Sequence, residues 1–410
     1  MSNEPALLPE GSVTTPPGFT AAAAHAGLKA GGALDVALLV SATSCATAGV
    51  FTRNALRAAP VLYDEDLLSE RPGRIRAVAM NARVANACTG PAGLAAAGAM
   101  AQAAERAAGL PPRTALVLST GVIGVPLPVD RVSQGLAAAA GRLTTTGGLE
   151  AARAIMTTDT RPKHCATRID TPAGPITVGG IAKGAGMIHP DMATLLGVLT
   201  TDAEVDAAAL APILRRVADR SFNAISVDGD TSTNDTVLLL ANGASRIDPT
   251  RDSSLAQRFE QAVQLVARSL ALAIVEDGEG ATKLVEIQVR GAATEAAARD
   301  IGRAIARSAL VKTALFGADP NWGRILAAAG AAGVPLSPDK ISLDAEDGAG
   351  WLALARAGGT AQPDLTRARA LFGGKKIRLR IDLGMGRAEA VVWTCDLSPE
   401  YVRINADYTS

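Results

Sequence analysis

The sequence predicts a layered fold that mixes helices with strands, of α/β or α+β type. Short β-type runs alternate with Ala-rich helical runs along most of its 410 residues. A long amphipathic helix lies in the second half, and strands with alternating hydrophobic and polar residues follow it. Elements of both kinds bury their apolar faces by packing in layers. We therefore expect a large layered core and a smaller α/β unit after it.

Several elements can be placed directly. Thr114 to Leu118 is typical of a buried strand, and Ala92 to Ala108 is Ala-rich and typical of helix. Apolar residues at three-to-four spacing predict one amphipathic helix, and they are Leu255, Phe259, Val263, Val266, Leu270 and Ile274. The apolar run after Thr194 predicts a central strand. Residues 1–18 are polar and Pro-rich, so we expect them to be poorly ordered.

Beyond residue 281 the pattern changes to that of the smaller unit. Apolar residues alternate with polar ones in two runs, Val285-Ile287-Val289 and Ile377-Leu379-Ile381. Gly384 to Arg387 then predicts a hairpin turn into a strand at Ala388 to Trp393. We therefore place the boundary between the two units near residue 281.

Composition excludes several classes of function. Forty basic residues balance forty acidic ones and no long run of like charge occurs, which argues against a nucleic-acid surface. Aromatic residues make up only 3% of the chain, so stacking platforms for bases or sugars are scarce. The most apolar stretch, Val36 to Thr52, is interrupted by Ser, Thr and Gly. It predicts core rather than a membrane span.

The cysteines and the first residues indicate the compartment. Four cysteines are spread along the chain without a C-x-x-C pair, which predicts neither a disulfide framework nor a zinc site. They are Cys45, Cys88, Cys165 and Cys395. The opening residues lack the basic and apolar regions of a signal peptide. We expect a cytoplasmic protein in a reducing compartment.

Common catalytic signatures are missing. The chain contains neither G-x-S-x-G nor H-E-x-x-H, and residues 179–184 are not a P-loop because Ala185 follows Gly184. The only histidines are His25, His164 and His189, for which a surface or core position is the simpler interpretation. No cluster of metal ligands is evident in the sequence.

The strongest chemical feature is residues 183–200, KGAGMIHPDMATLLGVLT, in which a glycine-rich loop leads into an apolar strand. The hydroxyl of Thr194 could attack the carbonyl of Ala193, move the acyl group from nitrogen to oxygen, and release the Thr194 amine by hydrolysis. An α-amine has a pKa of roughly 7.7–8.0. It can therefore act as the base for the hydroxyl of its own residue without a histidine. From the residues alone, a Thr that opens a strand is more often structural.

A resemblance to a known family changes this balance. Residues 183–196 resemble the self-processing site of the ornithine acetyltransferases, also called bifunctional glutamate N-acetyltransferases, of arginine biosynthesis. Further segments resemble the same family in the same order, and they are FTRN at 51–54 with AAPV at 58–61, STGVIG at 119–124, IMTTDT at 155–160, SVDGDTSTN at 226–234, DGEGATK at 277–283, DPNWGR at 319–324 and NADYTS at 405–410. The resemblance thus covers nearly the whole chain.

The resemblance implies a role for each matching residue. Thr194 would be the nucleophile after cleavage of the Ala193–Thr194 bond, and Thr120 with Gly121 would form the oxyanion hole. Lys183 would bind a carboxylate, and Glu279 would bind an amine or orient the Thr194 amine. The pocket would be completed by Thr157, Asn405 and Ser410, the last two requiring the C-terminal tail to fold back. Without the family, Thr120-Gly121 would be an ordinary strand-to-loop turn, Glu279 a solvated loop residue and Ser410 a frayed terminus.

The implied activity is acetyl transfer from N-acetylornithine to glutamate through an acetyl ester on Thr194, with acetyl-CoA as a possible second donor. The implied fold is a layered αββα core, shared with N-terminal-nucleophile-like aminopeptidases, and a smaller C-terminal α/β domain. Residues 1–193 would form an alpha chain, 194–280 would start the beta chain and complete the core, and 281–410 would form the smaller domain. Two copies of each chain would assemble, with no metal or organic cofactor and with no nucleic-acid or membrane partner.

Two departures from the family pattern stand out. Arg83-Val84 replaces a Gly-Asn pair, which puts the backbone role of that loop in question, and the chain ends in Thr-Ser rather than Thr-Thr. Two other functions remain open at this stage. One is an N-terminal-nucleophile aminopeptidase or amidase, in which water takes the acyl group. The other is a non-catalytic relative that only binds acetylornithine.

Overall fold

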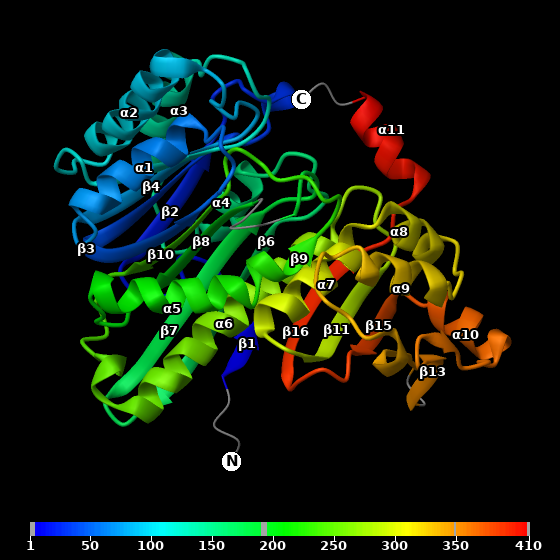
Figure 1. Cartoon of the computed structure of the whole chain (residues 1–410). Coiled ribbons are helices and arrows are strands. Elements are labelled where there is room, and N and C mark those ends of the chain that lie inside the picture. Colours follow the sequence, from blue (N-terminus) through cyan, green and yellow to red (C-terminus); the bar gives the residue numbers. More distant parts are fainter. Residues whose placement is uncertain (1–4, 190–194, 348–349, 408–410) are drawn as a thin grey trace.

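The computed structural model describes residues 5–189, 195–347 and 350–407 and shows two mixed sheets, each with its own helices (Figure 1). The larger sheet contains β1 (Ala6–Leu8), β6 (Lys163–Thr171), β7 (Gly174–Lys183), β8 (Leu196–Thr201), β10 (Thr236–Ala241), β3 (Val36–Phe51), β4 (Ile75–Asn81) and β5 (Ala115–Ser119) in spatial order, with β2 (Phe19–Ala24) beside β3. Its helices are α1 (Ala59–Glu70), α2 (Gly90–Ala107), α3 (Val129–Ala140), α4 (Gly148–Ala154), α5 (Ala207–Asp219) and α6 (Ser253–Glu276).

The long strand β3 lets this sheet fold into two layers. Its first part, from Val36 to Val40, pairs with β2 and β4, whereas its last part, from Ala46 to Phe51, pairs with β10. The two halves of the sheet therefore continue through one strand and face each other. The apolar stretch that the sequence assigned to the core rather than to a membrane is this strand. Within the described residues, no helix has the length and apolar character needed to cross a membrane.

Apolar side chains alternate between the two faces of the central strands, and each face packs against a different layer. In β10, Leu238 and Leu240 point to the cluster between the two half-sheets, while Val237 and Leu239 point to the helices α5 and α6. All four side chains are buried, as expected for a strand covered on both faces. On the far side, α1, α2 and α3 cover β2 to β5 through a further cluster. The order helix, sheet, sheet, helix confirms the predicted αββα core.

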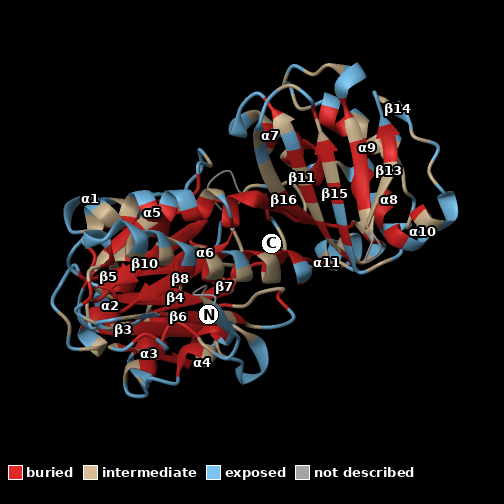
Figure 2. Cartoon of the chain, turned by 90° about the horizontal axis from the view of Figure 1, so that it is seen from below, coloured by how far each residue is buried: buried red, intermediate tan, exposed pale blue. Residues whose placement is uncertain are grey.

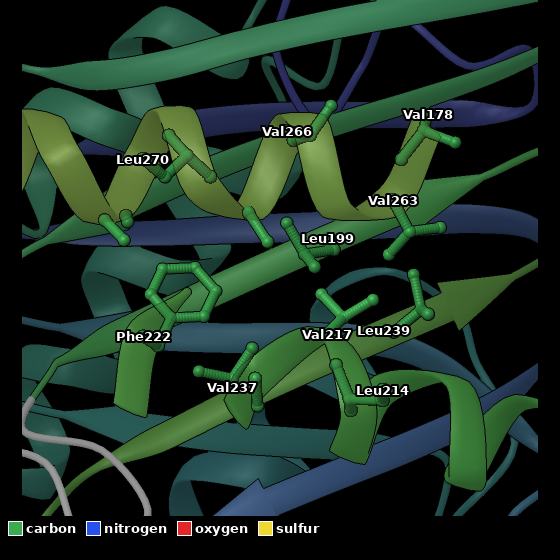
Figure 3. Packing of buried hydrophobic residues seen from close by; sticks show 14 of the residues in the cluster. Val178, Leu199, Leu214, Val217, Phe222, Val237, Leu239, Val263, Val266 and Leu270 are labelled. Carbon is green, nitrogen blue, oxygen red and sulfur yellow. The ribbon is translucent and has the colours of Figure 1, made fainter. Parts of the chain in front are cut away.

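Helix α6 shows how local sequence sets this packing (Figure 3). The side chain of Asp252 caps its first turn by accepting the Leu255 N–H at 2.7 Å. The predicted three-to-four stripe, which includes Val266 and Leu270, lies against Leu199 and Phe222 in the buried cluster. The amphipathic helix expected from the spacing is therefore confirmed. So are the strand at 114–118, found as β5, and the helix at 92–108, found as α2.

The second sheet and its helices form a separate lobe (Figure 2). Its strands are β14 (Gly359–Thr360), β13 (Gly350–Arg356), β12 (Ser342–Asp347), β15 (Lys376–Asp382), β11 (Leu284–Ala292), β16 (Ala388–Cys395) and β9 (Ile225–Ser226) in spatial order. Its helices are α7 (Glu295–Arg307), α8 (Ala309–Phe316), α9 (Trp322–Gly330), α10 (Leu365–Phe372) and α11 (Pro399–Asp407). Strand β9 lies before α6 in the chain but pairs with β16, so a segment from before residue 281 completes this sheet.

Two local predictions were wrong. The turn at Gly384 to Arg387 does not make a hairpin, because β11 lies between β15 and β16 and pairs with both. The turn instead crosses the end of β11, where the Leu383 N–H donates to the carbonyl of Arg290. The prediction of poor order was also wrong for residues 5–18, whereas residues 1–4 lie outside the described residues. Strand β1 pairs with β6, and Ser12 and Val13 are buried against the core.

Candidate active site

Six of the nine predicted site residues line one cavity of about 130 Å³. They are Thr120, Gly121, Thr157, Lys183, Glu279 and Asn405. The other three, Ala193, Thr194 and Ser410, lie outside the described residues. Leu195, which follows Thr194 directly, lines the same cavity. Residues that lie far apart in the sequence therefore meet at one cavity.

Strand ends and two later segments bring these groups together. Thr120 follows the last residue of β5, and Lys183 is the last residue of β7. The neighbouring strand β8 runs antiparallel to β7, with Leu196 opposite Lys183, so the chain that precedes β8 arrives at the same edge. Glu279 comes from the loop after α6. Asn405 comes from α11, the last helix of the chain, which follows the second sheet.

The Thr120-Gly121 turn has no room for a side chain at Gly121. Gly121 has a φ of 134°, and a Cβ there would lie 2.1 Å from the carbonyl carbon of Arg83. Val84 forms β-bridges with both Thr120 and Val122. The Arg83-Val84 pair, which departs from the family pattern, therefore supports this turn through its backbone. Within the described part of the chain, no hydrogen bond from the Gly121 N–H is found. That donor is suited to a developing oxyanion.

Lys183 supplies a positive charge at the cavity wall. Its Nζ donates to Thr157 Oγ1 at 2.8 Å and to Thr120 Oγ1 at 3.2 Å. Because Thr120 Oγ1 accepts from the ammonium, the hydroxyl proton of Thr120 can be donated into the cavity. Burial lowers the pKa of Lys183, and the carboxylate of Asp159 acts in the opposite direction.

Glu279 supplies a negative charge. Its Oε2 accepts from Asn405 Nδ2 at 2.7 Å, and its backbone N–H donates to the carbonyl of Ala185. A Cβ on Gly186 would lie 2.4 Å from the Glu279 carboxylate, so this glycine makes room for the charge. The side chain is buried rather than solvated, and α11 packs back over the site. The two opposite charges suit a ligand that carries a carboxylate and an amine.

Sequence reasoning assigned no role to two residues of the segment 226–235. Asn234 lines the cavity, and its Nδ2 donates to the carbonyls of Ala85 and Ser119 at 2.6 and 2.9 Å. These two bonds connect the start of the Thr120-Gly121 turn to the segment that follows Val84. Asp228 accepts the N–H groups of Met187 and Ile188, at 2.6 and 2.8 Å, and so holds the chain that leads to residue 190. Burial raises the pKa of Asp228. The only available signal was the SVDGDTSTN segment itself.

None of the three histidines lines the cavity. His164 Nδ1 lies 2.8 Å from the carbonyl of Gly11, and His25 Nδ1 lies 2.8 Å from that of Ala33. His189 Nδ1 lies 3.0 Å from Ser226 Oγ. Among the residues with described side chains, no group of three or more His, Cys, Asp or Glu residues is arranged to hold a metal ion.

Comparisons with known proteins show which family this chain resembles. A sequence model of the ArgJ family matches residues 20–410. The arginine biosynthesis bifunctional protein ArgJ of Symbiobacterium thermophilum is 50% identical over 403 residues, covering 97% of this chain and 98% of the relative. That of Dehalococcoides mccartyi is 46% identical over 408 residues, covering 98% of each. A solved structure of ornithine acetyltransferase complexed with ornithine, from Mycobacterium tuberculosis, is 45% identical, with a TM-score of 0.43, covering 47% of this chain and 99% of that one.

The layered core, the cavity and the relatives together define an enzyme of the arginine-biosynthesis acetyltransferase class. The chain belongs to the ArgJ family. The expected family and enzyme class are therefore confirmed. A beta-aminopeptidase from Burkholderia sp. is 15% identical with a TM-score of 0.43, over 67% of this chain and 88% of that one. Likeness at that level gives the aminopeptidase alternative no support.

Proposed function

We propose that this protein moves an acetyl group from N-acetylornithine to glutamate through an ester on Thr194. The observation that carries the proposal is the pairing of charges in the cavity. Buried Lys183 and buried Glu279 line it together with the Thr120-Gly121 turn, and Leu195 brings the chain from Thr194 to the same wall. An acylated diamino acid carries a carboxylate, an amine and an acyl carbonyl, which match these three features.

Each residue then has a binding role. Lys183 holds the α-carboxylate of N-acetylornithine, and Glu279 holds its side-chain ammonium. Asn405 orients the Glu279 carboxylate through its hydrogen bond, and Thr157 orients Lys183. Ser410 completes the pocket from the end of the chain.

The reaction runs in two halves. Thr194 Oγ attacks the acetyl carbonyl while the Thr194 amine takes the hydroxyl proton, and the Thr120 hydroxyl and Gly121 N–H stabilise the oxyanion. The C–N bond breaks, and the proton goes to the leaving ornithine amine. The α-amine of glutamate then attacks the acetyl ester. The ester bond breaks, Thr194 Oγ regains a proton, and N-acetylglutamate leaves.

Self-cleavage prepares this nucleophile. Thr194 Oγ attacks the Ala193 carbonyl, the acyl group moves from nitrogen to oxygen, and water hydrolyses the ester. The products are an alpha chain of residues 1–193 and a beta chain that begins with the Thr194 amine. Residues 194–280 complete the core, and residues 281–410 form the smaller domain. Two copies of each chain form the assembly.

Acetyl-CoA is proposed as a second donor, in line with relatives that are named bifunctional. We propose a cytoplasmic location, because the cysteines are free in the structure and widely spaced. Nucleic acid and membranes are not among the proposed partners.

The first test is the intact mass of the denatured protein beside a Thr194→Ala variant. We expect two fragments that meet at Ala193–Thr194 in the parent and one uncut chain in the variant. Brief incubation with N-acetylornithine should then add one acetyl group to the fragment that begins at Thr194. A single full-length parent chain, or an acetyl group that cannot be trapped there, would contradict the proposed mechanism. Free acetate made without glutamate would indicate a hydrolase instead.

A further inference from the structure

Behind the wall of the cavity lies a buried charge cluster for which the proposed chemistry has no use. Lys163 Nζ lies 2.7 Å from Asp159 Oδ1 and 2.6 Å from Asp277 Oδ2. The three side chains are 1%, 0% and 4% exposed, and none of them lines the cavity. Burying charged groups costs several kcal/mol per ion before their attraction offsets it, so such a cluster is poor evidence of stability alone.

Asp159 is bonded to both segments that carry the cationic side of the site. Its Oδ1 accepts the N–H of Gly184 at 2.7 Å, and Gly184 directly follows Lys183. Its Oδ2 accepts the N–H of Thr157 at 3.0 Å, and Thr157 Oγ1 in turn accepts from Lys183 Nζ. One carboxylate therefore fixes the backbone at Lys183 and at the hydroxyl that orients it.

Asp277 connects the same cluster to the anionic side of the site. It accepts from both the backbone N–H and the hydroxyl of Thr160. Two residues further along the chain is Glu279. In the proposed cleaved protein, Asp159 and Lys163 belong to the first chain and Asp277 to the second. The cluster thus also joins the two chains behind the cavity.

The charges around Lys183 give Asp159 a second effect. The carboxylates of Asp159, Glu279 and Asp235 favour the charged form of Lys183, whereas the ammonium of Lys163 opposes it. Asp159 is the largest of these influences after burial. Lys29, on the loop before β3, is a further cation in electrostatic contact with Lys183. Burial raises the pKa of Asp159, but Lys183 and Lys163 hold it below its usual range, so the carboxylate stays ionised.

We infer that Asp159 is a positioning residue that keeps Lys183 protonated and directed at the substrate carboxylate, while Lys163 holds Asp159 in place. This inference rests on the proposed carboxylate-binding role of Lys183. It accounts for the burial of the cluster, because a nearby carboxylate in the interior favours the charged form of a buried ammonium. A purely mechanical brace would stabilise the fold without affecting the charge of Lys183.

The test is the pH dependence of kcat/KM for N-acetylornithine in Asp159→Asn beside the parent. The side chains have nearly the same shape, but the variant lacks the charge and one of the two backbone acceptors. We expect the alkaline fall of kcat/KM to move to lower pH, because Lys183 would lose its proton more easily. At mildly alkaline pH the KM should rise about tenfold, with a smaller change in kcat.

Asp277→Asn is the matched control. It makes the same chemical change to the other buried partner of Lys163, but Asp277 is not among the largest influences on the charge of Lys183. We expect the alkaline limb of its pH profile, the fall of kcat/KM at high pH, not to move to lower pH, even if the midpoint of thermal unfolding falls. An unmoved limb in Asp159→Asn, or an equal downward shift in both variants, would overturn the inference in favour of a mechanical brace.

A second variant covers the case in which Asp159→Asn does not fold. Lys163→Gln removes the one cation of the cluster that opposes the charge on Lys183, and its amide can still donate to a carboxylate. Its alkaline limb should move to higher pH, and an unmoved limb contradicts the inference. The acetyl trap on the parent keeps the two proposals apart. If the parent cannot be acetylated, the proposed function fails, whereas an acetylated parent with unmoved limbs in the variants refutes only the role of Asp159.

Discussion

At the residue scale, the site depends on backbone positions that exclude a side chain. Gly121 combines a φ of 134° with a close approach to Arg83, and Gly186 faces the carboxylate of Glu279. At neither position could a Cβ be accommodated without a shift of neighbouring atoms. These glycines let the chain place donors and charges against a small cavity.

Replacing Gly121 should separate catalysis from folding. In Gly121→Ala, the added methyl displaces the turn from Arg83 and misplaces the N–H proposed for the oxyanion. Loss of such a donor lowers kcat by about 10²–10³-fold. Gly124→Ala is the matched control, since Gly124 also has a positive φ, 82°, but open space around its Cβ position. Steady-state kinetics that show equal losses in the two variants would exclude a specific role for the Gly121 N–H.

A second residue-scale prediction concerns Asp64 in α1, which is fully buried. Its Oδ1 accepts the Val117 N–H at 2.9 Å, and within the described chain its Oδ2 has no partner. Burial raises the pKa of this carboxyl well above its usual range, against the smaller effect of the Val117 N–H. The folded protein therefore binds this proton more tightly than the unfolded chain. Stability is lost as pH rises from the unfolded pKa of about 3.9 towards the folded one.

The Asp64→Asn variant has no carboxyl group at this position, so it lacks this loss of folding stability with rising pH. We expect the variant to be more stable than the parent by on the order of 1 kcal/mol at neutral pH, with a difference that shrinks as pH falls to about 4. Chemical denaturation across this range measures it. Asp66→Asn, on the same helix but with a side chain that is 67% exposed, is the control and should show no such trend. A constant difference between Asp64→Asn and the parent at every pH would disprove the linkage.

At the element scale, helix α11 is the part of the second lobe that reaches the cavity. It has no fully buried residue, yet Asn405 Nδ2 donates to Glu279 and the hydroxyl of Tyr401 lies 3.3 Å from Asp228. Burial raises the pKa of Tyr401, and the carboxylates of Asp228 and Glu279 add to this effect. The helix is therefore held by polar contacts with the site more than by a hydrophobic face.

Asn405→Ala should loosen this contact. A hydrogen bond to a charged group contributes about 1.5–3 kcal/mol, and the lower figure applies to this exposed asparagine. We expect the KM for N-acetylornithine to rise about tenfold, with little change in thermal stability. Arg403→Ala is the control on the same helix, because within the described chain the side chain of Arg403 bonds to Glu400, also in α11. If both variants leave KM unchanged, α11 does not form part of the binding site.

At the scale of the whole molecule, the two proposed chains are interleaved in one sheet. Strand β8 of the second chain pairs with β7 of the first, and β10 of the second pairs with β3 of the first. The cores on both faces of these strands also combine residues from the two chains. Cutting one peptide bond before β8 leaves these contacts in place.

We therefore expect the cleaved chains to remain one species. On size-exclusion chromatography, the parent should elute with the uncut Thr194→Ala variant, although a denaturing gel shows two bands. Residues 1–193 expressed alone should not fold, because β3 and β7 would each expose an apolar edge. Separate elution of the two chains under native conditions would contradict this account of the sheet.

Local sequence was sufficient for elements whose signal lies within the element. The stripe of α6, the Ala-rich helix α2 and the buried strand β5 follow from spacing and composition, because those patterns reflect the face that each element buries. The hairpin at Gly384 failed for the opposite reason. Turn residues show that the chain reverses there, but not that β11, from nearly a hundred residues earlier, would lie between the two strands.

The sequence by itself determined the family, the main elements and the identity of the charged and hydroxyl groups of the site, because these are properties of residue types in a fixed order. Only the tertiary structure decided that Thr120, Lys183, Glu279 and Asn405 share one cavity. It alone revealed the buried Asp159–Lys163–Asp277 cluster behind them. Such a site needs strand ends, a loop and a returning helix to meet, and their meeting depends on packing between distant segments, which no local pattern encodes.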